Sequence, residues 1–222
     1  MLQSILLLLG CAVVGYLFGS IPNAVLIGKI FFHKDVREYG SKNAGGTNAG
    51  RVLGKKIGFI VIVLDLIKTI VPIYLCFCLL EYTPLSEYGI SEYGYIVAAF
   101  SALIGHCFPI FAGFKGGKAV SSFAAICLAT NWLISLIGFV FFMAVLKWKK
   151  YVSLSSISAS ILVAILSLIN IFIPGNLGTY LFPNSLGYFL LMLISSAILI
   201  VRHRSNIVRL IHHEERKITW MK

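Results

Sequence analysis

The chain has 222 residues, of which 59% are hydrophobic and only 12% are charged, and its mean hydropathy is +0.92. A soluble domain carries about 25% charged residues, so this composition excludes a soluble protein and indicates an integral membrane protein. The formal net charge of +11 would suit a nucleic-acid partner, but the positions of the basic residues favour a different explanation.

The apolar segments are long enough to cross a hydrocarbon core of about 30 Å as helices, whereas a membrane barrel would need a two-residue alternation that is absent. They predict an all-α integral membrane protein with seven transmembrane helices, at 4–28, 57–80, 94–112, 119–131, 132–147, 153–173 and 185–201. No basic region precedes the first span and no small-residue cleavage site follows it, so we expect it to be retained. All spans are expected to form one membrane-embedded domain, residues 1–222.

Residues 119–146 allow a second interpretation, because they could form one helix of about 42 Å at 1.5 Å per residue. One helix would place Lys147, Lys149 and Lys150 outside while the basic C-terminal tail stays inside. A break at Asn131-Trp132 keeps both basic segments on the same side of the membrane, so seven spans are the favoured prediction.

The basic residues are confined to a few segments. All nineteen Lys and Arg except Lys68 fall at 29–56, at 115–118, at 147–150 or from residue 202 onward. Segments 81–93 and 174–184 hold none, and the former carries Glu81, Glu87 and Glu92. With the N-terminus outside and the C-terminus in the cytoplasm, every basic cluster faces the cytoplasm. The charge therefore predicts topology, and no nucleic-acid partner is expected.

A polar, glycine-rich segment, GSKNAGGTNAGR at 40–51, lies between the first two spans. Glycine lets backbone N–H groups turn toward an anion, and a nearby arginine supplies charge and a bidentate contact. The functional interpretation is an anion-binding loop shaped by its glycines, Gly45 among them, with Arg51 as clamp and these donors: Ser41, Asn43, Thr47 and Asn48. The alternative is a polar turn that leads into the second span. Neither a Walker loop nor a dinucleotide site is predicted, because the first pattern is absent and no strand precedes the segment.

The segment FKGGK at 114–118 is a second glycine-rich interruption, in which Lys115 and Lys118 flank Gly116 and Gly117. We expect the glycines to bend the chain and Lys118 to open the next helix, whose free N–H groups attract anions. The alternative is that both lysines merely extend toward the interface from a helix end.

Two further groups of polar residues carry predictions. Asp65 and Lys68 lie three apart inside the second span, so we expect a mutually neutralising, structural ion pair. In the tail, His203, Asn206 and Arg209 would form one polar stripe if the last span continues as a helix. The alternative there is a basic segment on anionic lipid headgroups.

Several absences narrow the chemistry. The sequence has no G-x-S-x-G elbow and no His-x4-Asp pair, and it has only two aspartates. No metal, cofactor or covalent nucleophile is therefore predicted. The five cysteines lie in apolar segments and are expected to be buried, and the remaining histidines are interpreted as structural: His33, His106, His212 and His213.

Five blocks together resemble the bacterial acyl-phosphate:glycerol-3-phosphate acyltransferases, the PlsY family: 19–29, 36–54, 64–68, 105–120 and 202–215. The resemblance implies a seven-span protein of the bacterial inner membrane with its active site facing the cytoplasm. It implies transfer of a fatty acyl group from acyl phosphate to glycerol 3-phosphate, which gives lysophosphatidic acid and phosphate and begins phospholipid synthesis. The expected partners are these two substrates and membrane lipids, and the expected state is a monomer.

The resemblance also implies roles for individual residues. Ser41, Arg51, His203 and Asn206 match the catalytic positions, and residues 115–118 match the glycerol-phosphate loop. Glu215 matches the acidic residue that closes the last motif and is expected to have a structural role. Either His203 or the phosphate of the substrate is the base. The sequence departs from the family pattern where Gly46 replaces an alanine and where two residues replace glycines: Ala119 and His213.

Two other classes of function compete with this interpretation. Short helices at 119–147 and charges inside a span would also suit an organic-anion transporter, which would be expected to show inverted repeats. A lipid-binding structural protein would explain the basic face but not the glycines.

Overall fold

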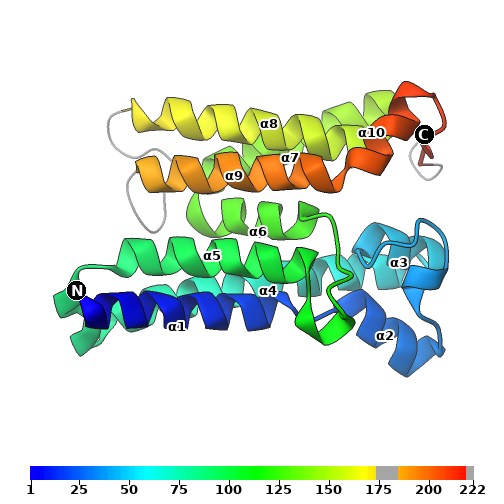
Figure 1. Ribbon diagram of the computed structural model, residues 1–222. Coiled ribbons are helices and arrows are strands. Elements are labelled where there is room, and N and C mark those ends of the chain that lie inside the picture. Colours follow the sequence, from blue (N-terminus) through cyan, green and yellow to red (C-terminus); the bar gives the residue numbers. More distant parts are fainter. Residues whose placement is uncertain (174–184, 219–222) are drawn as a thin grey trace. The chain divides into compact units, whose positions relative to one another are not determined.

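The computed structural model describes residues 1–173 and 185–218, and the elements within these ranges are α-helices and short 3-10 helices (Figure 1). The all-α prediction is therefore confirmed. Contacts between Cα atoms divide the chain into two compact units, a first unit at Met1–Ile126 and a second unit at Cys127–Lys222. The predicted outer segment 174–184 lies outside the described residues, and a single membrane-embedded domain stays a prediction.

In the first unit, α1 (Leu2–Gly19) packs against α5 (Ser91–Cys107) and α4 (Lys55–Tyr82). Small residues permit a close approach of α1 to α5. A Cβ atom added at Gly15 would overlap the backbone oxygen of Ala98, and one at Gly19 would overlap that of Ala102. Helices in a membrane gain stability from such close backbone packing, since hydrophobic burial contributes little between apolar surfaces in lipid.

The predicted first span at 4–28 is not one continuous helix. The helix stops at Gly19 and resumes as α2 (Asn23–Phe32), with Pro22 as the residue that precedes it. Proline lacks an N–H donor and its ring is unfavourable inside a helix, which explains a break that the apolar composition did not reveal. The break leaves the carbonyl of Ile21 available to accept a hydrogen bond from another element.

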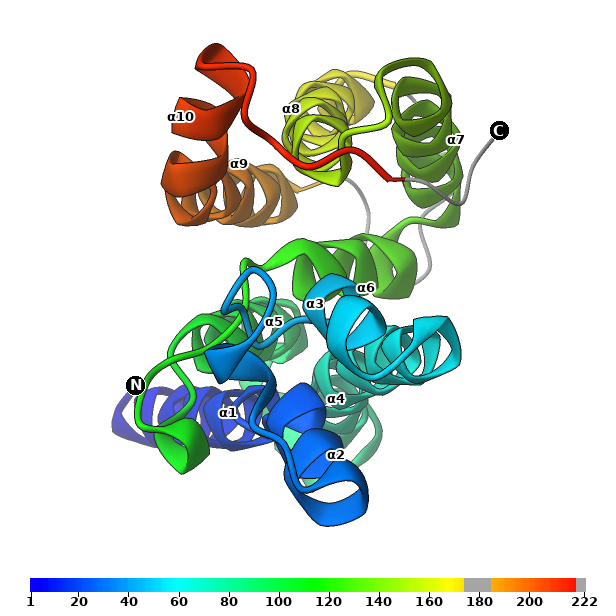
Figure 2. The ribbon, with the colours of Figure 1, turned by 90° about the vertical axis from the view of Figure 1, so that its right-hand side faces the viewer.

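The break, the short helix α3 (Gly46–Val52) and the segment after α5 all lie at one end of the first unit (Figures 1 and 2). Helix α4 is continuous for 28 residues although it contains Pro72. It carries Asp65 and Lys68 in buried positions, so the polar residues inside the second predicted span are packed against protein.

Residues 119–146 form two helices, α6 (Val120–Thr130) and α7 (Trp132–Lys149). Asn131 separates them: its side chain accepts a hydrogen bond of 2.9 Å from the backbone N–H of Ile134, which makes it the N-cap of α7. This excludes the single long helix and confirms the predicted break. The 11 residues of α6 span only about 16 Å at 1.5 Å per residue, which is too short to cross the hydrocarbon core unaided.

The second unit continues with α8 (Val152–Ile171), which packs against α7 and α9 (Leu186–Arg202). Helix α10 (Arg204–Ile211) follows α9 with a bend of 59°, so the last span does not extend straight into the tail as the predicted polar stripe required. The described residues contain 5 helices or helix pairs long and apolar enough to cross a membrane, or 6 if α9 and α10 are one span. The protein is therefore a multi-pass membrane protein, and the count of seven stays a prediction.

Candidate functional site

The first loop (residues 33–45) and α3 together contain the predicted anion-binding segment. The structure divides residues 40–51 into a turn up to Gly45 and the helix α3, which Gly45 precedes as N-cap. In this turn, Gly40 and Lys42 adopt positive φ angles of 62° and 56°. The segment is thus half helix and half loop, a division that its even distribution of small polar residues does not indicate.

Asn48 organises the first loop. Its Oδ1 accepts a hydrogen bond of 2.8 Å from the backbone N–H of Ser41, and its Nδ2 donates to the carbonyls of Val36 at 2.8 Å and Asn43 at 2.9 Å. A longer contact of 3.2 Å reaches the carbonyl of Tyr39. Asn48 is 1% exposed, so both ends of its amide serve the loop backbone, and its predicted contact with substrate stays a prediction.

The other predicted residues of this segment differ in exposure. Ser41, Thr47 and Arg51 are exposed, whereas Asn43 is half-buried. Thr47 and Arg51 are four apart on α3 and therefore share one helical face. Asn48 holds the backbone of Ser41, which places this serine at a fixed point of the loop surface.

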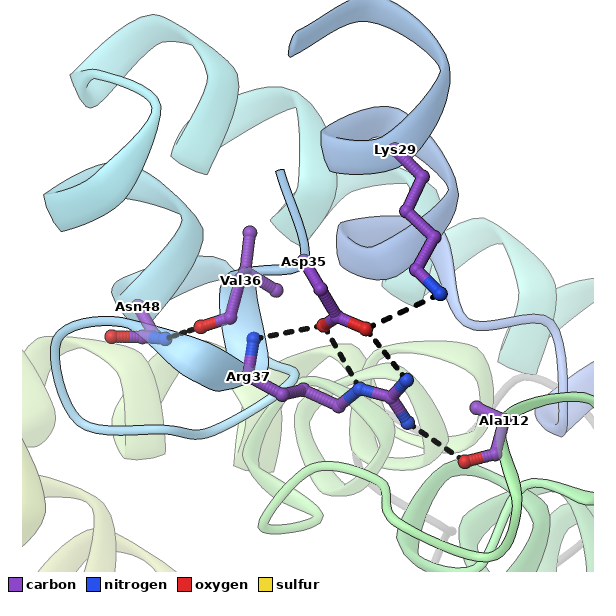
Figure 3. Close-up of polar contacts among 6 residues, drawn as sticks. All are labelled: Lys29, Asp35, Val36, Arg37, Asn48 and Ala112. Carbon is purple, nitrogen blue, oxygen red and sulfur yellow. Dashed lines mark hydrogen bonds and ion pairs between the residues drawn. The ribbon is translucent and has the colours of Figure 1, made fainter. Parts of the chain in front are cut away.

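A half-buried ion pair at the start of the first loop was not found by sequence reasoning (Figure 3). Arg37 donates to both carboxylate oxygens of Asp35, from Nε at 3.0 Å and from Nη2 at 2.8 Å. Lys29 adds a contact of 3.4 Å. The hydrogen bonds from Arg37 hold the pKa of Asp35 well below its usual range. The only available signal was a D-x-R pattern just after an apolar segment, which is weak.

The second loop (residues 108–119) returns to the end of α5. Its backbone N–H at Gly117 donates 3.0 Å to the carbonyl of His106. A Cβ atom at Gly117 would overlap the imidazole of His106, and one at Gly116 would overlap the carbonyl of that residue. The two glycines are therefore required for close approach to α5, in addition to the bend that was predicted.

The lysines of the second loop flank this contact. Lys115 is exposed and Lys118 is half-buried. Lys118 lies two residues before α6, which begins at Val120, so the expectation that it opens the helix is corrected. The intervening residue, Ala119, has a φ of 66°, and this left-handed conformation delays the start of the helix.

The predicted ion pair inside the second span is confirmed. Lys68 Nζ lies 2.9 Å from Asp65 Oδ1, and it also donates 2.6 Å to the carbonyl of Ile21 at the break between α1 and α2. Asn23 donates 2.9 Å to the same Asp65 oxygen, while His106 Nδ1 lies 4.0 Å from Asp65 Oδ2. Sequence reasoning missed Asn23 and His106 as neighbours of this pair, because they come from different helices.

One pocket joins these features within the first unit. Its lining combines the second-loop glycines and Ala44 of the first loop with the buried side chains of Lys68 and His106; the other lining residues are Ile21, Pro22 and Pro109. The pocket thus brings together both glycine-rich loops and a buried cation. Ser41, Arg51, Lys115 and Lys118 are not among its lining residues.

In the second unit, Glu215 accepts hydrogen bonds from three residues of two helices, α10 and α8. It accepts from Asn206 at 2.7 Å, from Arg209 at 2.7 Å and from Ser153 of α8 at 2.9 Å. Burial alone would raise the pKa of Glu215, but these hydrogen bonds outweigh it and lower the pKa below its usual value. These contacts favour the structural role predicted for Glu215, because they join α10 and the tail to α8.

His203 lies at the bend between α9 and α10 and is 3% exposed. Its Nδ1 is 2.8 Å from the carbonyl of Leu199. A carbonyl only accepts hydrogen bonds, so Nδ1 donates in this contact, and in the neutral imidazole Nε2 is the nitrogen that lacks a proton. Three residues later, Asn206 is held by Glu215.

The predicted catalytic residues are thus divided between the units: Ser41 and Arg51 belong to the first, and His203 and Asn206 to the second. Their action at one site stays a prediction. Within the described ranges, no group of three or more His, Cys, Asp or Glu could hold a metal ion.

Comparison with known proteins places this arrangement in a family. A family model described as glycerol-3-phosphate acyltransferase matches residues 9–213. A glycerol-3-phosphate acyltransferase of Staphylococcus haemolyticus (strain JCSC1435) is 46% identical over 211 residues, which cover 94% of this chain and 96% of that protein. One of Staphylococcus aureus (strain Newman) is 41% identical over 211 residues, which cover 93% of this chain and 95% of that protein.

Two solved structures have the same fold. The crystal structure of PlsY (YgiH), an integral membrane glycerol 3-phosphate acyltransferase, in its glycerol 3-phosphate form gives a TM-score of 0.79 at 30% identity and covers 96% of each chain. Its lysophosphatidic acid form gives a TM-score of 0.78 at 30% identity over 96% of this chain and 95% of that chain. The chain therefore belongs to the glycerol-3-phosphate acyltransferase family of integral membrane enzymes.

Proposed function

We propose that this enzyme transfers a fatty acyl group from acyl phosphate to glycerol 3-phosphate and releases lysophosphatidic acid and inorganic phosphate. One observation carries the proposal beyond membership of the family: Ala44 of the first glycine-rich loop and Gly116 and Gly117 of the second line the same small pocket beside a buried lysine. Such an arrangement suits a reaction in which both substrates carry a phosphate group.

The reaction itself needs little from the protein beyond alignment. Acyl phosphate is an activated mixed anhydride. The hydroxyl oxygen of glycerol 3-phosphate forms a bond to the acyl carbon, the bond from that carbon to the phosphate oxygen breaks, and the hydroxyl proton passes to a base. Holding the two substrates in register removes much of the entropic barrier to their encounter, so no cofactor is required for the transfer.

Lys115 and Lys118 are proposed to bind the phosphate of glycerol 3-phosphate. They flank the glycine pair on a loop whose conformation is determined by its contact with His106. An exposed lysine and a half-buried lysine on either side of the glycine pair can contact a phosphate from two directions.

Ser41, Arg51, His203 and Asn206 are proposed to polarise the acyl carbonyl and to hold the leaving phosphate. The protonation of His203 at Nδ1 supports a role in proton transfer for Nε2, and the phosphate of the substrate is the alternative base. If the four residues act on one step, combining Ser41→Ala with His203→Ala will cost much less than the product of the separate losses.

The active site is proposed to face the cytoplasm, because every basic segment of the sequence lies on that side in a topology with an external N-terminus. Single cysteines at Glu87 and at Lys55, in a Cys78→Ser background, test this with an impermeant maleimide. On intact cells the Glu87→Cys protein should be labelled and the Lys55→Cys protein protected. The reverse pattern would overturn the orientation.

The activity is tested by incubating purified enzyme with palmitoyl phosphate and measuring phosphate release with and without glycerol 3-phosphate. We expect release that depends on the acceptor, and little reaction with palmitoyl-CoA. If palmitoyl-CoA alone supports transfer, the proposed donor is wrong.

Arg51→Ala should lower turnover roughly 10²–10³-fold in folded protein, the range observed when one group that stabilises transition-state charge is removed.

A further inference from the structure

Arg37 connects the two glycine-rich loops (Figure 3). Two of its nitrogens bind the carboxylate of Asp35 at 3.0 and 2.8 Å. The third, Nη1, donates 2.8 Å to the backbone carbonyl of Ala112, which is 75 residues away in sequence. Ala112 ends the short 3-10 helix η3 (Ile110–Ala112) at the beginning of the second loop.

The direction of the guanidinium group is determined inside the first loop. Asp35 precedes the 3-10 helix η1 (Val36–Glu38), and its Oδ1 accepts a hydrogen bond of 3.0 Å from the backbone N–H of Arg37 as well as the one from Nε. The carboxylate is thus held by the same short helix that carries the arginine. A planar guanidinium bound at two points has no rotational freedom, so its remaining N–H groups extend from the loop in a defined direction.

The ion pair of Asp35 and Arg37 is also partly protected from solvent. The Asp35 and Arg37 side chains are 11% and 22% exposed, whereas Lys29, the second cation at this carboxylate, is 58% exposed. The pKa of Asp35 is lowered and that of Arg37 is raised by their mutual hydrogen bonds, so both stay charged over the working pH range. Partial burial makes the interaction stronger than an exposed surface ion pair.

The position of Ala112 matters for the pocket. The next two residues, Gly113 and Phe114, have φ angles of 61° and 59°, and they turn the chain into the segment that carries Gly116 and Gly117. The pocket is lined by these glycines and by Ala44 of the first loop. A shift of Ala112 relative to the first loop would therefore change the separation of the two pocket walls.

We propose that Arg37 is a positioning residue that holds the second loop at a defined distance from the first, so that the two phosphate-bearing substrates are bound in register. The expected effect on the KM rests on the proposed function, whereas the expected effect on the distance between the loops does not. The hydrogen bonds of Arg37 go to Asp35 and Ala112 and not to the proposed substrate-binding side chains of either loop. Arg37 therefore acts through the carbonyl of Ala112.

The distance between the loops can be measured without any substrate. Spin labels at Tyr39→Cys and Phe111→Cys, which are 48% and 61% exposed, would report it by pulsed electron resonance in a Cys78→Ser background, since the other four cysteines are buried. Arg37→Ala should broaden the distance distribution. Arg37→Lys should broaden it too, because one ammonium group cannot bind Asp35 at two points and also reach Ala112. Lys29→Ala is the matched control, since it removes a cation from the same carboxylate without touching the second loop.

Kinetics provide the second measurement. Losing a charged hydrogen bond of this kind should raise the KM for glycerol 3-phosphate roughly tenfold in Arg37→Lys, while the thermal midpoint of this variant stays unchanged. The control variant Lys29→Ala should have unchanged kinetics. A merely structural role would lower the thermal midpoint and the amount of active enzyme without changing KM. If Arg37→Ala does not fold, Arg37→Lys carries both measurements.

The two proposals can fail separately. An unchanged distance distribution in Arg37→Lys, or an unchanged KM in active enzyme, overturns the positioning role. A wild-type protein without acyltransferase activity overturns the proposed function, while the distance measurement still decides whether Arg37 holds the loops together.

Discussion

The first and second loops are both rich in glycine, but different interactions hold them in place. The first loop is organised by side chains, through the amide of Asn48 and the pair of Asp35 and Arg37. The second is placed by the absence of side chains, because Gly116 and Gly117 lie directly against His106. One loop should therefore be most sensitive to the removal of a side chain, and the other to the addition of one.

The largest effect is expected from Asn48→Ala. The substitution removes the hydrogen bonds of the Ser41 N–H and of the Val36 and Asn43 carbonyls, which should cost about 3 kcal/mol of unfolding free energy. Thermal unfolding in detergent measures the loss. Thr47→Ala, one residue earlier on the exposed face of α3, is the control and should unfold like wild type. Equal stability of the two variants would contradict the organising role of Asn48.

The second loop should respond to Gly117→Ala. The new methyl group would overlap the His106 ring and displace the loop at a cost of about 1–3 kcal/mol, which should raise the KM for glycerol 3-phosphate at least tenfold. Steady-state kinetics check this. Adding His106→Ala removes the overlapping ring and should recover part of the loss. Gly113→Ala tests backbone strain without overlap, since Gly113 has a φ of 61° and nothing lies within 4 Å of its added Cβ. If Gly113→Ala raises the KM as much as Gly117→Ala does, close packing against His106 is not the reason for the effect of Gly117→Ala.

The hydrogen-bonded carboxylate of Glu215 predicts a dependence of stability on pH. Because the pKa of Glu215 is lower in the folded than in the unfolded protein, its stabilisation is present above the unfolded value and is lost as the pH falls through the folded one. Wild-type thermal stability should therefore decline below about pH 4.5 more steeply than that of Glu215→Gln, which has no carboxylate to protonate. Parallel curves for the two proteins would exclude Glu215 as a source of this dependence.

The smallest effects concern two residues that stand where the family pattern has glycine. Ala119 and His213 have φ angles of 66° and 59°, a conformation that costs an L-amino acid about 1 kcal/mol relative to glycine. Ala119→Gly and His213→Gly should each raise the unfolding free energy by up to about 1 kcal/mol, the gain being reduced by the greater freedom of glycine in the unfolded chain. A loss of stability in either variant would show that the substituted position is not strained.

The sequence by itself determined the features that depend on composition and on local pattern. Apolar length and the distribution of charge predicted a helical, multi-pass membrane protein, because these features follow from transfer into lipid. The spacing of Asp65 and Lys68 predicted their ion pair, since residues three apart on one helix are neighbours. The blocks that carry the family resemblance predicted the family that the comparisons confirmed.

Only the tertiary structure decided which distant residues meet. The contacts of Arg37 with Ala112, of His106 with Gly117 and of Asn23 with Asp65 join segments that are 75, 11 and 42 positions apart. No local periodicity encodes such contacts, because they depend on how close the small residues of α1 allow it to approach α5 and on where Pro22 interrupts the first span. The two loops were visible in the sequence as separate glycine-rich segments, and packing alone brought them to one pocket.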